Sequence, residues 1–234
     1  MNLTSINNIL RTIIVAGINQ IVFNVKENNT ILISGIDKDG SAVVFHRIPN
    51  NGTLEKSIGV HRVSVFLDRL KLFDLTKAVI EQKISSYFIS SLTLKEGRKK
   101  ISYTFAEPAN INHPKEIVED VIIHSIDITK EMLESLYKAS QTLNSNEFFL
   151  YSDAQDIIFK VVDETSGDAF EETLQQVGKN IPQFQYKWNI HQFFKLIRED
   201  LKTSPHTTIN IGEHGYITLK VSDINFLLLP LFYE

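Results

Sequence analysis

The sequence contains no cysteine, so the protein can form neither a disulfide framework nor a site built on a thiolate. Its N-terminus, Met-Asn-Leu-Thr-Ser-Ile-Asn-Asn, lacks the basic start and the apolar run of a secretory signal. The longest apolar run, Phe226 to Tyr233, is far too short to span a bilayer. We therefore expect a soluble cytoplasmic protein that has no membrane partner.

An excess of positive charge is also missing. The chain holds 24 Lys and Arg residues against 28 Asp and Glu residues, which gives a formal net charge of −4. This balance argues against a protein that coats nucleic acid through bulk basicity. A local basic surface is the alternative that the net charge does not exclude. With 234 residues, of which 43% are hydrophobic, the chain suits one large domain or two domains of about 115 residues each.

Motifs that carry chemistry are scarce. Gly35 and Gly40 have the spacing of a phosphate-binding loop, but Ser41 and Ala42 follow where Lys and Ser or Thr are required, so a hairpin turn is preferred. The seven histidines show no metal-binding pattern, and there is no Gly-x-Ser-x-Gly elbow. We expect no catalysis, no cofactor and no metal. A small-molecule enzyme with a site assembled from scattered residues stays an alternative.

The strongest pattern lies between Ile190 and Lys202. Apolar residues recur there at the spacing that places them along one side of an α-helix, and they are Ile190, Phe193, Phe194, Ile197 and Leu201. The basic residues lie off this stripe, and they are His191, Lys195, Arg198 and Lys202. A helix packed on a sheet through its phenylalanines would hold these cations outward. The alternative is an ordinary solvated helix face.

The same arrangement occurs 127 positions earlier in the chain (190 − 63). The stripe is repeated by Val63, Phe66, Leu67 and Leu70. A second helix and the strand after it obey the same shift: Ile6, Ile9 and Leu10 map onto Leu133, Leu136 and Tyr137, Arg11 maps onto Lys138, and Ile21-Val22-Phe23 maps onto Phe148-Phe149-Leu150. A shared ungapped shift indicates two structurally equivalent halves. Two unrelated α+β domains of similar size are the alternative.

Each half of the sequence reads as helix, strands, helix, strands. We predict helices over 3–16, 63–75, 129–142 and 190–202, with strands over 18–26, 30–36, 42–48, 57–62, 78–84, 87–94, 99–105, 121–128, 147–151, 156–162, 169–175, 186–190, 207–211, 216–221 and 225–232. Because the strands follow one another in sequence, they favour antiparallel sheets with two helices on one face, in an α+β fold. Residues 107–120, which contain Pro108 and Pro114, form the predicted connector between domains 1–106 and 121–234.

These features together resemble a known family. The duplicated order of elements, the proline-bearing connector, the segment from Asp127 to Leu143 and the terminal Phe226-Leu227-Leu228-Leu229-Pro230 are similar to sliding clamps of the proliferating cell nuclear antigen type. In size the chain is closest to the T4-type bacteriophage clamps. The resemblance covers the whole chain as a pattern of elements. One departure is Asp68, which stands where the later helix carries Lys195.

The resemblance implies a non-catalytic DNA clamp fold and a polymerase processivity factor. Three subunits would close head to tail into a ring around duplex DNA, with strand 99–105 of one subunit pairing with strand 169–175 of the next. Helix cations would contact phosphates without reading sequence, and the candidates are Arg11, Lys71, Lys130, Lys138, Lys195, Arg198 and Lys202. For a viral protein, the location would be the host cell cytoplasm. A structural ring or tube component of a virus particle is the alternative function.

The resemblance also implies protein partners, namely a DNA polymerase and a clamp loader. A short partner motif would insert apolar side chains between the connector and the C-terminal segment. The candidate residues are Ile36, Ile111, Ile117, Val118, Leu227, Leu229 and Pro230. The alternative is that 226–233 is simply a last core strand.

Overall fold

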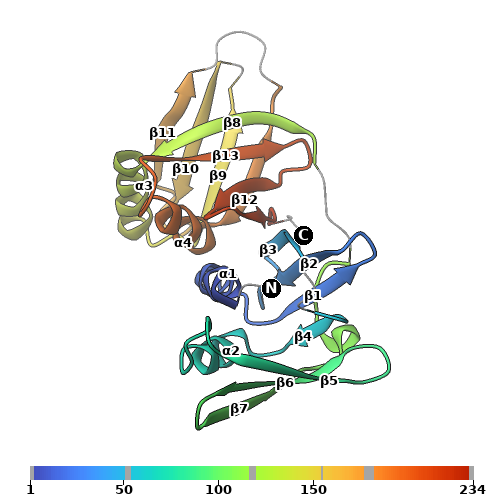
Figure 1. Ribbon diagram of the computed structural model, residues 1–234. Helices are drawn as coiled ribbons and strands as arrows, with labels where there is room; N and C mark the ends of the chain where they lie inside the picture. Colours follow the sequence, from blue (N-terminus) through green and yellow to red (C-terminus); the bar gives the residue numbers. More distant parts are fainter. Residues whose placement is uncertain (1–2, 51–53, 116–119, 154, 177–181, 232–234) are drawn as a thin grey trace. The chain divides into compact units, whose positions relative to one another are not determined.

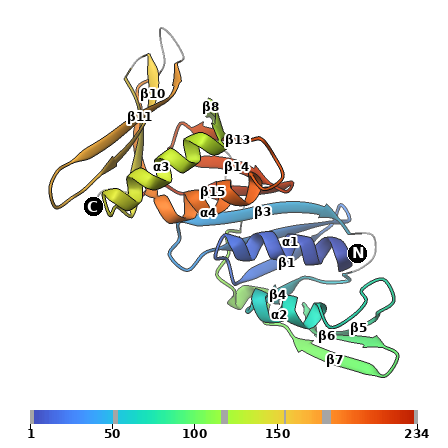
Figure 2. The ribbon, with the colours of Figure 1, turned by 90° about the vertical axis from the view of Figure 1, so that its left-hand side faces the viewer.

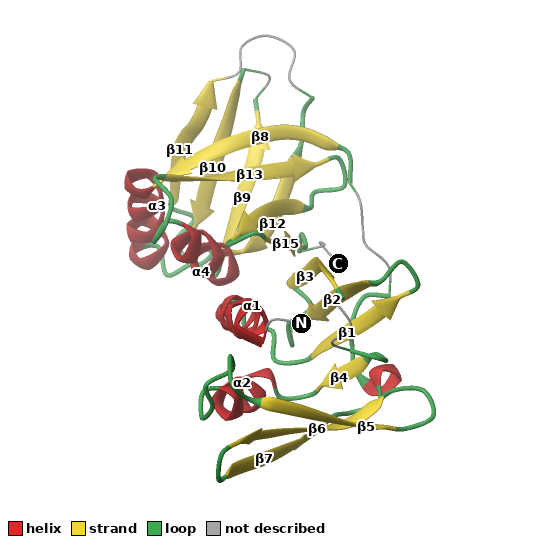
Figure 3. Cartoon of the chain, viewed as in Figure 1, coloured by secondary structure: helices red, strands yellow, loops and turns green. Residues whose placement is uncertain are grey.

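A computed structural model describes residues 3–50, 54–115, 120–153, 155–176 and 182–231. The chain divides into two compact units, Met1–Ile117 and Val118–Glu234. The division falls inside the predicted connector, whose boundaries stay a prediction. Each unit contains two helices that pack against each other and antiparallel strands on one side of them (Figure 1 and Figure 3). The predicted α+β fold is confirmed.

The first unit contains helices α1 (Leu3–Val15) and α2 (Val63–Leu70). Helix α1 ends where the Gly17 N–H donates to the carbonyl of Ile14 at 2.9 Å, with Gly17 at a φ of 75° that favours glycine. Helix α2 ends five residues earlier than we predicted. The carboxylate of Asp74 accepts hydrogen bonds from the N–H and the hydroxyl of Thr76, at 3.1 and 2.6 Å. Such a local turn competes with continuation of the helix.

Two antiparallel groups of strands complete the first unit. Neighbouring strands in one group are β4 (Ile58–Val60), β1 (Ile21–Lys26), β2 (Thr30–Ile36) and β3 (Ala42–Pro49), in that order. A separate sheet contains β5 (Val79–Ile84), β6 (Ile89–Glu96) and β7 (Lys99–Thr104) in the order β5-β6-β7 (Figure 2). In the turn between β2 and β3, the Asp37 carboxylate accepts from the Ser41 N–H at 2.7 Å. The glycine pair Gly35 and Gly40 therefore belongs to a hairpin.

The second unit repeats this plan and adds one strand. Its helices are α3 (Lys130–Thr142) and α4 (Ile190–Asp200). One sheet has the order β11 (Ala169–Gln176), β10 (Asp156–Val162), β9 (Glu147–Ser152), β12 (Gln185–Asn189). In a second group of strands, each strand pairs with the next in the order β15 (Ile224–Leu228), β14 (Ile217–Val221), β13 (His206–Gly212), β8 (Ile122–Thr129).

The shift of 127 positions is visible in the element boundaries. Helix α3 begins 127 positions after α1 begins (130 − 3) and ends 127 positions after α1 ends (142 − 15). Helix α4 begins 127 positions after α2 (190 − 63), and β11 repeats both ends of β3 (169 − 42 and 176 − 49). Strand β8 is the exception, since no described strand of the first unit takes its place.

The residue directly before the predicted connector, Ala106, pairs with Gly59 of β4. Ala106 donates to the Gly59 carbonyl at 2.8 Å and accepts from the Gly59 N–H at 3.2 Å. A Cβ on Gly59 would lie 2.7 Å from the Ala106 oxygen and 2.9 Å from Ile111 Cγ1, so only glycine allows this approach. After the short 3-10 helix Pro108–Asn110, Ile111 is buried and the His113 ring lies 2.9 Å from the hydroxyl of Ser34.

The segment that enters the second unit is held by an ion pair. His214, in the turn between β13 and β14, places Nδ1 2.8 Å from Oδ1 of Asp120 and donates its backbone N–H to Oδ2 at 3.1 Å. Gly212 leaves room for the carboxylate, because a Cβ there would lie 1.9 Å from Oδ2. The hydrogen bond and the charge of Asp120 raise the pKa of His214 above its ordinary value of 6.5, and Glu213 adds a smaller contribution.

This ion pair predicts a specific dependence of stability on pH. Because the pKa of His214 is higher in the folded chain, the pair stabilises the fold below pH 6.5 and loses this effect as the pH rises through the folded pKa. NMR titration should find His214 titrating above 6.5, and Asp120→Asn should lower that pKa more than Glu213→Gln does. If both variants leave the titration of His214 unchanged, the pairing does not exist in solution.

Candidate nucleic-acid interface

Helices α3 and α4 lie side by side (Figure 2). Their side chains border an open groove of about 540 Å³. Each helix is oriented by a capped start and an apolar stripe. Thr129 caps α3 by accepting from the N–H of Met132 at 3.3 Å, and Asn189 caps α4 by accepting from the N–H of His191 at 2.9 Å. The stripes turn the charged faces outward. The groove is lined by Lys130, Leu133, Glu134, Tyr137, Lys138, Arg198, Leu201 and Lys202.

Tyr137 is one of the residues that line this groove. It is 37% exposed, and its ring contacts the ring of the buried Phe194 edge to face, with 5.3 Å between centroids. The guanidinium carbon of Arg198 lies 4.8 Å from the Tyr137 centroid, the geometry of a cation–π contact. The periodicity of the sequence places Tyr137 in an apolar stripe and does not predict this role. The one signal in the sequence is a phenol at the position that the repeat pairs with Leu10.

The structure brings four of the seven predicted DNA-binding residues together in the groove. They are Lys130, Lys138, Arg198 and Lys202. Lys202 forms an ion pair with Glu199, whereas Lys130 and Lys138 have no ion pair within the described residues. Glu134 also lines the groove and reduces its positive charge. Lys195 is exposed on α4 but does not line the groove.

The other two predicted cations belong to the first unit. Arg11 is exposed on α1, and Lys71, directly after α2, forms an ion pair with Asp68 at 2.8 Å. Arg69 turns toward β7, where it donates to the carbonyl of Ser102 at 3.3 Å and lies 5.0 Å from the ring centroid of Tyr103. Within the described residues, the helices of the second unit therefore present the denser group of cations.

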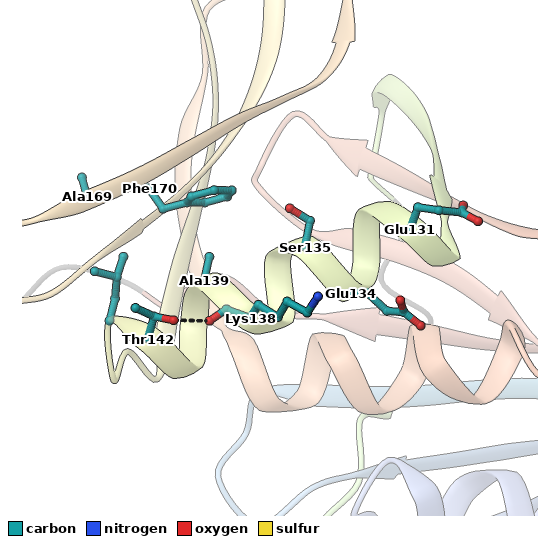
Figure 4. A pocket seen from close by; sticks show the side chains of 9 residues that line it. Glu131, Glu134, Ser135, Lys138, Ala139, Thr142, Ala169 and Phe170 are labelled. Carbon is teal, nitrogen blue, oxygen red and sulfur yellow. Dashed lines mark hydrogen bonds between the residues drawn. The ribbon is translucent and has the colours of Figure 1, made fainter.

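A second groove, of about 550 Å³, lies between α3 and β11, and we call it the edge groove (Figure 4). Ser135 donates to Glu172 Oε2 at 2.7 Å and so fastens α3 to β11. Figure 4 shows the ring of Phe170 facing α3 at Ala139. The full lining is Glu131, Glu134, Ser135, Lys138, Ala139, Thr142, Leu143, Ala169 and Phe170. The mixture of small apolar surface and rim charges suits an inserted apolar side chain.

The predicted partner-binding residues differ in exposure. Ile36 is half-buried on β2, and Ile111 is buried, which leaves its side chain little surface for a partner in this conformation. Ile117 and Val118 lie outside the described residues. Their roles stay predictions. No described group of three or more His, Asp or Glu side chains is placed to hold a metal ion.

The C-terminal segment departs from the predicted strand. Strand β15 ends at Leu228, where we predicted a strand to 232, because Pro230 has no N–H to donate to a ladder. Leu227 is buried although it lies on the opposite face from Phe226, and Pro230 is buried as well. Leu229 is half-buried, so it is more accessible to a partner than Leu227 and Pro230. Among the described helices, none has the length and apolar character to cross a membrane.

Comparisons with known proteins agree on the fold. No family model and no curated protein matches the sequence. Among solved structures, the chain is similar to the A. fulgidus PCNA bound to the C-terminal region of FEN-1, at 17% identity and a TM-score of 0.63, covering 100% of this chain and 98% of that one. The Entamoeba histolytica PCNA gives 11% identity and a TM-score of 0.63, covering 97% and 95%.

The chain is also similar in structure to a bacterial clamp. The Helicobacter pylori beta clamp bound to a DNA ligase peptide has 16% identity and a TM-score of 0.65, covering 97% of this chain. This chain spans 63% of the length of that clamp. The order of elements, the two similar units and these neighbours lead to one conclusion: the chain has the fold of the sliding clamps of the proliferating cell nuclear antigen and beta-clamp type.

Proposed function

We propose that this chain is a DNA sliding clamp, a non-catalytic processivity factor whose ring surrounds duplex DNA and tethers a polymerase. The observation that carries the proposal is the cation-lined groove between α3 and α4, in a fold shared with clamps. Phosphate contacts carry no sequence information, so cations on helix faces hold DNA without stopping it at one site. Topological enclosure then supplies retention, and the protein needs no catalytic group.

The electrostatics of the chain fit this mechanism. Three chains carry a formal charge of −12 (3 × −4), which disfavours DNA on the outside of a ring. The Tyr137 ring holds Arg198 in the groove, so the Arg198 side chain loses less conformational entropy when it binds a phosphate. Lys130 and Lys138 stay free of ion pairs within the described residues. We propose that Lys130, Lys138, Lys195 and Arg11 contact phosphates directly. Lys71 and Lys202 form ion pairs with Asp68 and Glu199, so a phosphate must replace these carboxylates to bind them.

Reversing the charge of Lys138, Lys195 and Arg198 to Glu should shorten the residence of the protein on nicked circular DNA and reduce polymerase processivity. The slope of log affinity against log salt is negative, and each lost phosphate contact should reduce its magnitude by about 0.9. The matched control reverses three exposed lysines away from these helices, Lys38, Lys83 and Lys220, and should leave retention unchanged.

Full retention by the helix variant would mean that the helix faces are merely solvated. The same assay tests the rival particle component, because a clamp slides off when the nicked circle is linearised. A ring or tube subunit of a particle neither stays on the circle nor leaves the linear form.

A homotrimer is the proposed assembly, with β7 of one subunit pairing with β11 of the next. Both strands lie at the edge of their sheets in the described chain. Lys100 gives β7 a positive charge and Glu172 gives β11 a negative one, whereas Lys99 and Glu171 pair with Glu96 and Lys160 of their own chain. The two edges are complementary through Lys100 and Glu172. A head-to-tail interface of this kind forms a ring when the rotation closes.

An exposed leucine lies near β7, the strand that we propose for the interface. Leu72 is 59% exposed, and its carbonyl accepts from Nζ of Lys99 at 3.3 Å, which places it at the start of β7. We propose that Leu72 of one subunit enters the edge groove of its neighbour between Ala139 and Phe170. Burying a leucine side chain contributes about 1.5–3 kcal/mol at each interface.

Leu72→Asp should convert the trimer to monomers at micromolar concentration, as measured by light scattering, with an unchanged circular dichroism spectrum because Leu72 is exposed. Val121→Asp is the matched control, since Val121 is 64% exposed in the other unit and should leave the trimer mass unchanged. A wild-type monomer at micromolar concentration argues against the ring itself. A trimeric Leu72→Asp variant argues against this placement of the interface.

Partner proteins are the last part of the proposal. Two of the similar clamps were solved with a bound segment of another protein, a FEN-1 C-terminal region and a DNA ligase peptide. By analogy, we propose that a polymerase or clamp-loader motif binds this chain near Ile36, the connector and the segment Leu227–Pro230. Leu229 is the accessible residue of that segment.

Leu229→Asp should weaken binding of a polymerase C-terminal peptide at least about tenfold, which corresponds to about 1.4 kcal/mol, while the trimer mass stays the same. Ile122→Asp, at a residue that is 56% exposed, is the matched control and should bind normally. Unchanged peptide binding by Leu229→Asp would place the docking surface elsewhere.

A further inference from the structure

A carboxylate lies one turn before three of the candidate DNA-binding lysines. The pairs of positions are Asp68 and Lys71, Glu134 and Lys138, and Glu199 and Lys202. A separation of three or four residues places two side chains next to each other on a helix surface, and a Glu that precedes its Lys by four residues is in the more favourable order. Each of these lysines therefore has a carboxylate of its own chain within reach.

Two of the three pairs are closed in this structure. Nζ of Lys71 lies 2.8 Å from Oδ1 of Asp68, and Lys202 forms an ion pair with Glu199. Both lysines face water, since their side chains are 46% and 62% exposed. Ion pairs with this exposure contribute little to stability, because water and salt screen them. They can therefore open when another anion arrives, without loss of the fold.

The third pair is open. Glu134 and Lys138 are both exposed, and both line the groove between α3 and α4. Figure 4 shows the Lys138 side chain extended along α3 toward Glu134. Among the ion pairs of the described residues, none joins these two side chains. Glu134 is thus an acidic residue that stands beside a free lysine on the surface proposed to meet DNA.

Movement along DNA requires that contacts to phosphate break as readily as they form. A lysine that leaves a phosphate loses a charge-assisted hydrogen bond. A carboxylate one turn away offers the same kind of bond at once, so it replaces part of the lost attraction. The energy of the bound protein then varies less between one phosphate and the next, and the step between them becomes faster.

We propose that the carboxylates of these three pairs are exchange partners. Each takes over its lysine when a phosphate leaves and releases the lysine when the next phosphate arrives. The carboxylates are positioning residues, because they act on DNA through their lysines. This inference rests on the proposed clamp function, and it adds a device that sets how fast the ring moves.

Glu134→Gln combined with Glu199→Gln removes two exchange partners of the second unit. By fluorescence anisotropy at one low salt concentration, this variant should bind a short linear duplex about fourfold more tightly, since one pair of this spacing corresponds to about twofold. A ring threaded onto a long duplex with ends that are then blocked should also diffuse more slowly, by about the same factor, in single-molecule tracking.

The matched control combines Glu164→Gln with Asp223→Asn. It removes the same charge from one exposed carboxylate without an ion pair in the described chain and from one that pairs with Lys220, three positions away. Affinity for the duplex and diffusion should both stay at the wild-type value, because neither carboxylate lies beside a lysine of the groove.

A double-mutant cycle separates exchange from plain repulsion of DNA by a carboxylate. In a Lys202→Gln protein, Glu199→Gln should have no further effect on duplex binding, because the lysine through which Glu199 acts is gone. Glu199→Asp should keep wild-type binding and diffusion, since Asp68 shows that an aspartate reaches a lysine three positions later.

Equal tightening by Glu199→Gln with and without Lys202 would indicate plain repulsion and overturns the proposal. Wild-type affinity and diffusion in the double glutamine variant also overturn it. In both cases, wild-type protein that stays on nicked circular DNA leaves the clamp function in place. A wild-type protein that neither binds the duplex nor stays on the circle overturns the clamp function together with this inference.

Discussion

Burial of one helix face against a sheet is the constraint on which the rest of this structure depends. In the second unit, Phe193 of α4 lies against Phe148 of β9, with 4.6 Å between ring centroids, and Phe148 stacks on Phe159 at 4.8 Å. This aromatic core sets the rotation of α4 about its own axis. The outward direction of Lys195 and Arg198 is therefore a consequence of packing, and the Tyr137 ring then holds the guanidinium of Arg198 in place.

The helices were predictable from the sequence because a period of 3.6 residues is a local property. Their ends were less predictable, since the early end of α2 depends on hydrogen bonds between Asp74 and Thr76. Strand β15 ends at Leu228 because of Pro230. The prediction followed the apolar run from 226 to 233 instead and therefore extended the strand too far. Local patterns thus gave the elements, and specific side-chain contacts decided where they stop.

The candidate site was predictable only in part. Seven cations were selected because they lie off apolar stripes, but the stripe does not tell which helices lie side by side. Four of the seven share a groove because α3 and α4 pack together, and Tyr137 gains its role from contact with Phe194 and Arg198. Lys71 and Lys202 differ from the others because Asp68 and Glu199, each one turn away, pair with them. The contacts between α3 and α4, in contrast, have no signature within a single window of sequence.

Trp188 gives the two units different spectroscopic properties. It is the single tryptophan of the chain, it is 1% exposed, and its indole N–H donates to the carbonyl of Gly215 at 2.9 Å. The surrounding core belongs to the second unit, where Phe148 stacks at 5.5 Å. Intrinsic tryptophan fluorescence therefore reports on the second unit alone, whereas circular dichroism reports on both. A difference between the two unfolding transitions would measure how independently the repeated halves hold together.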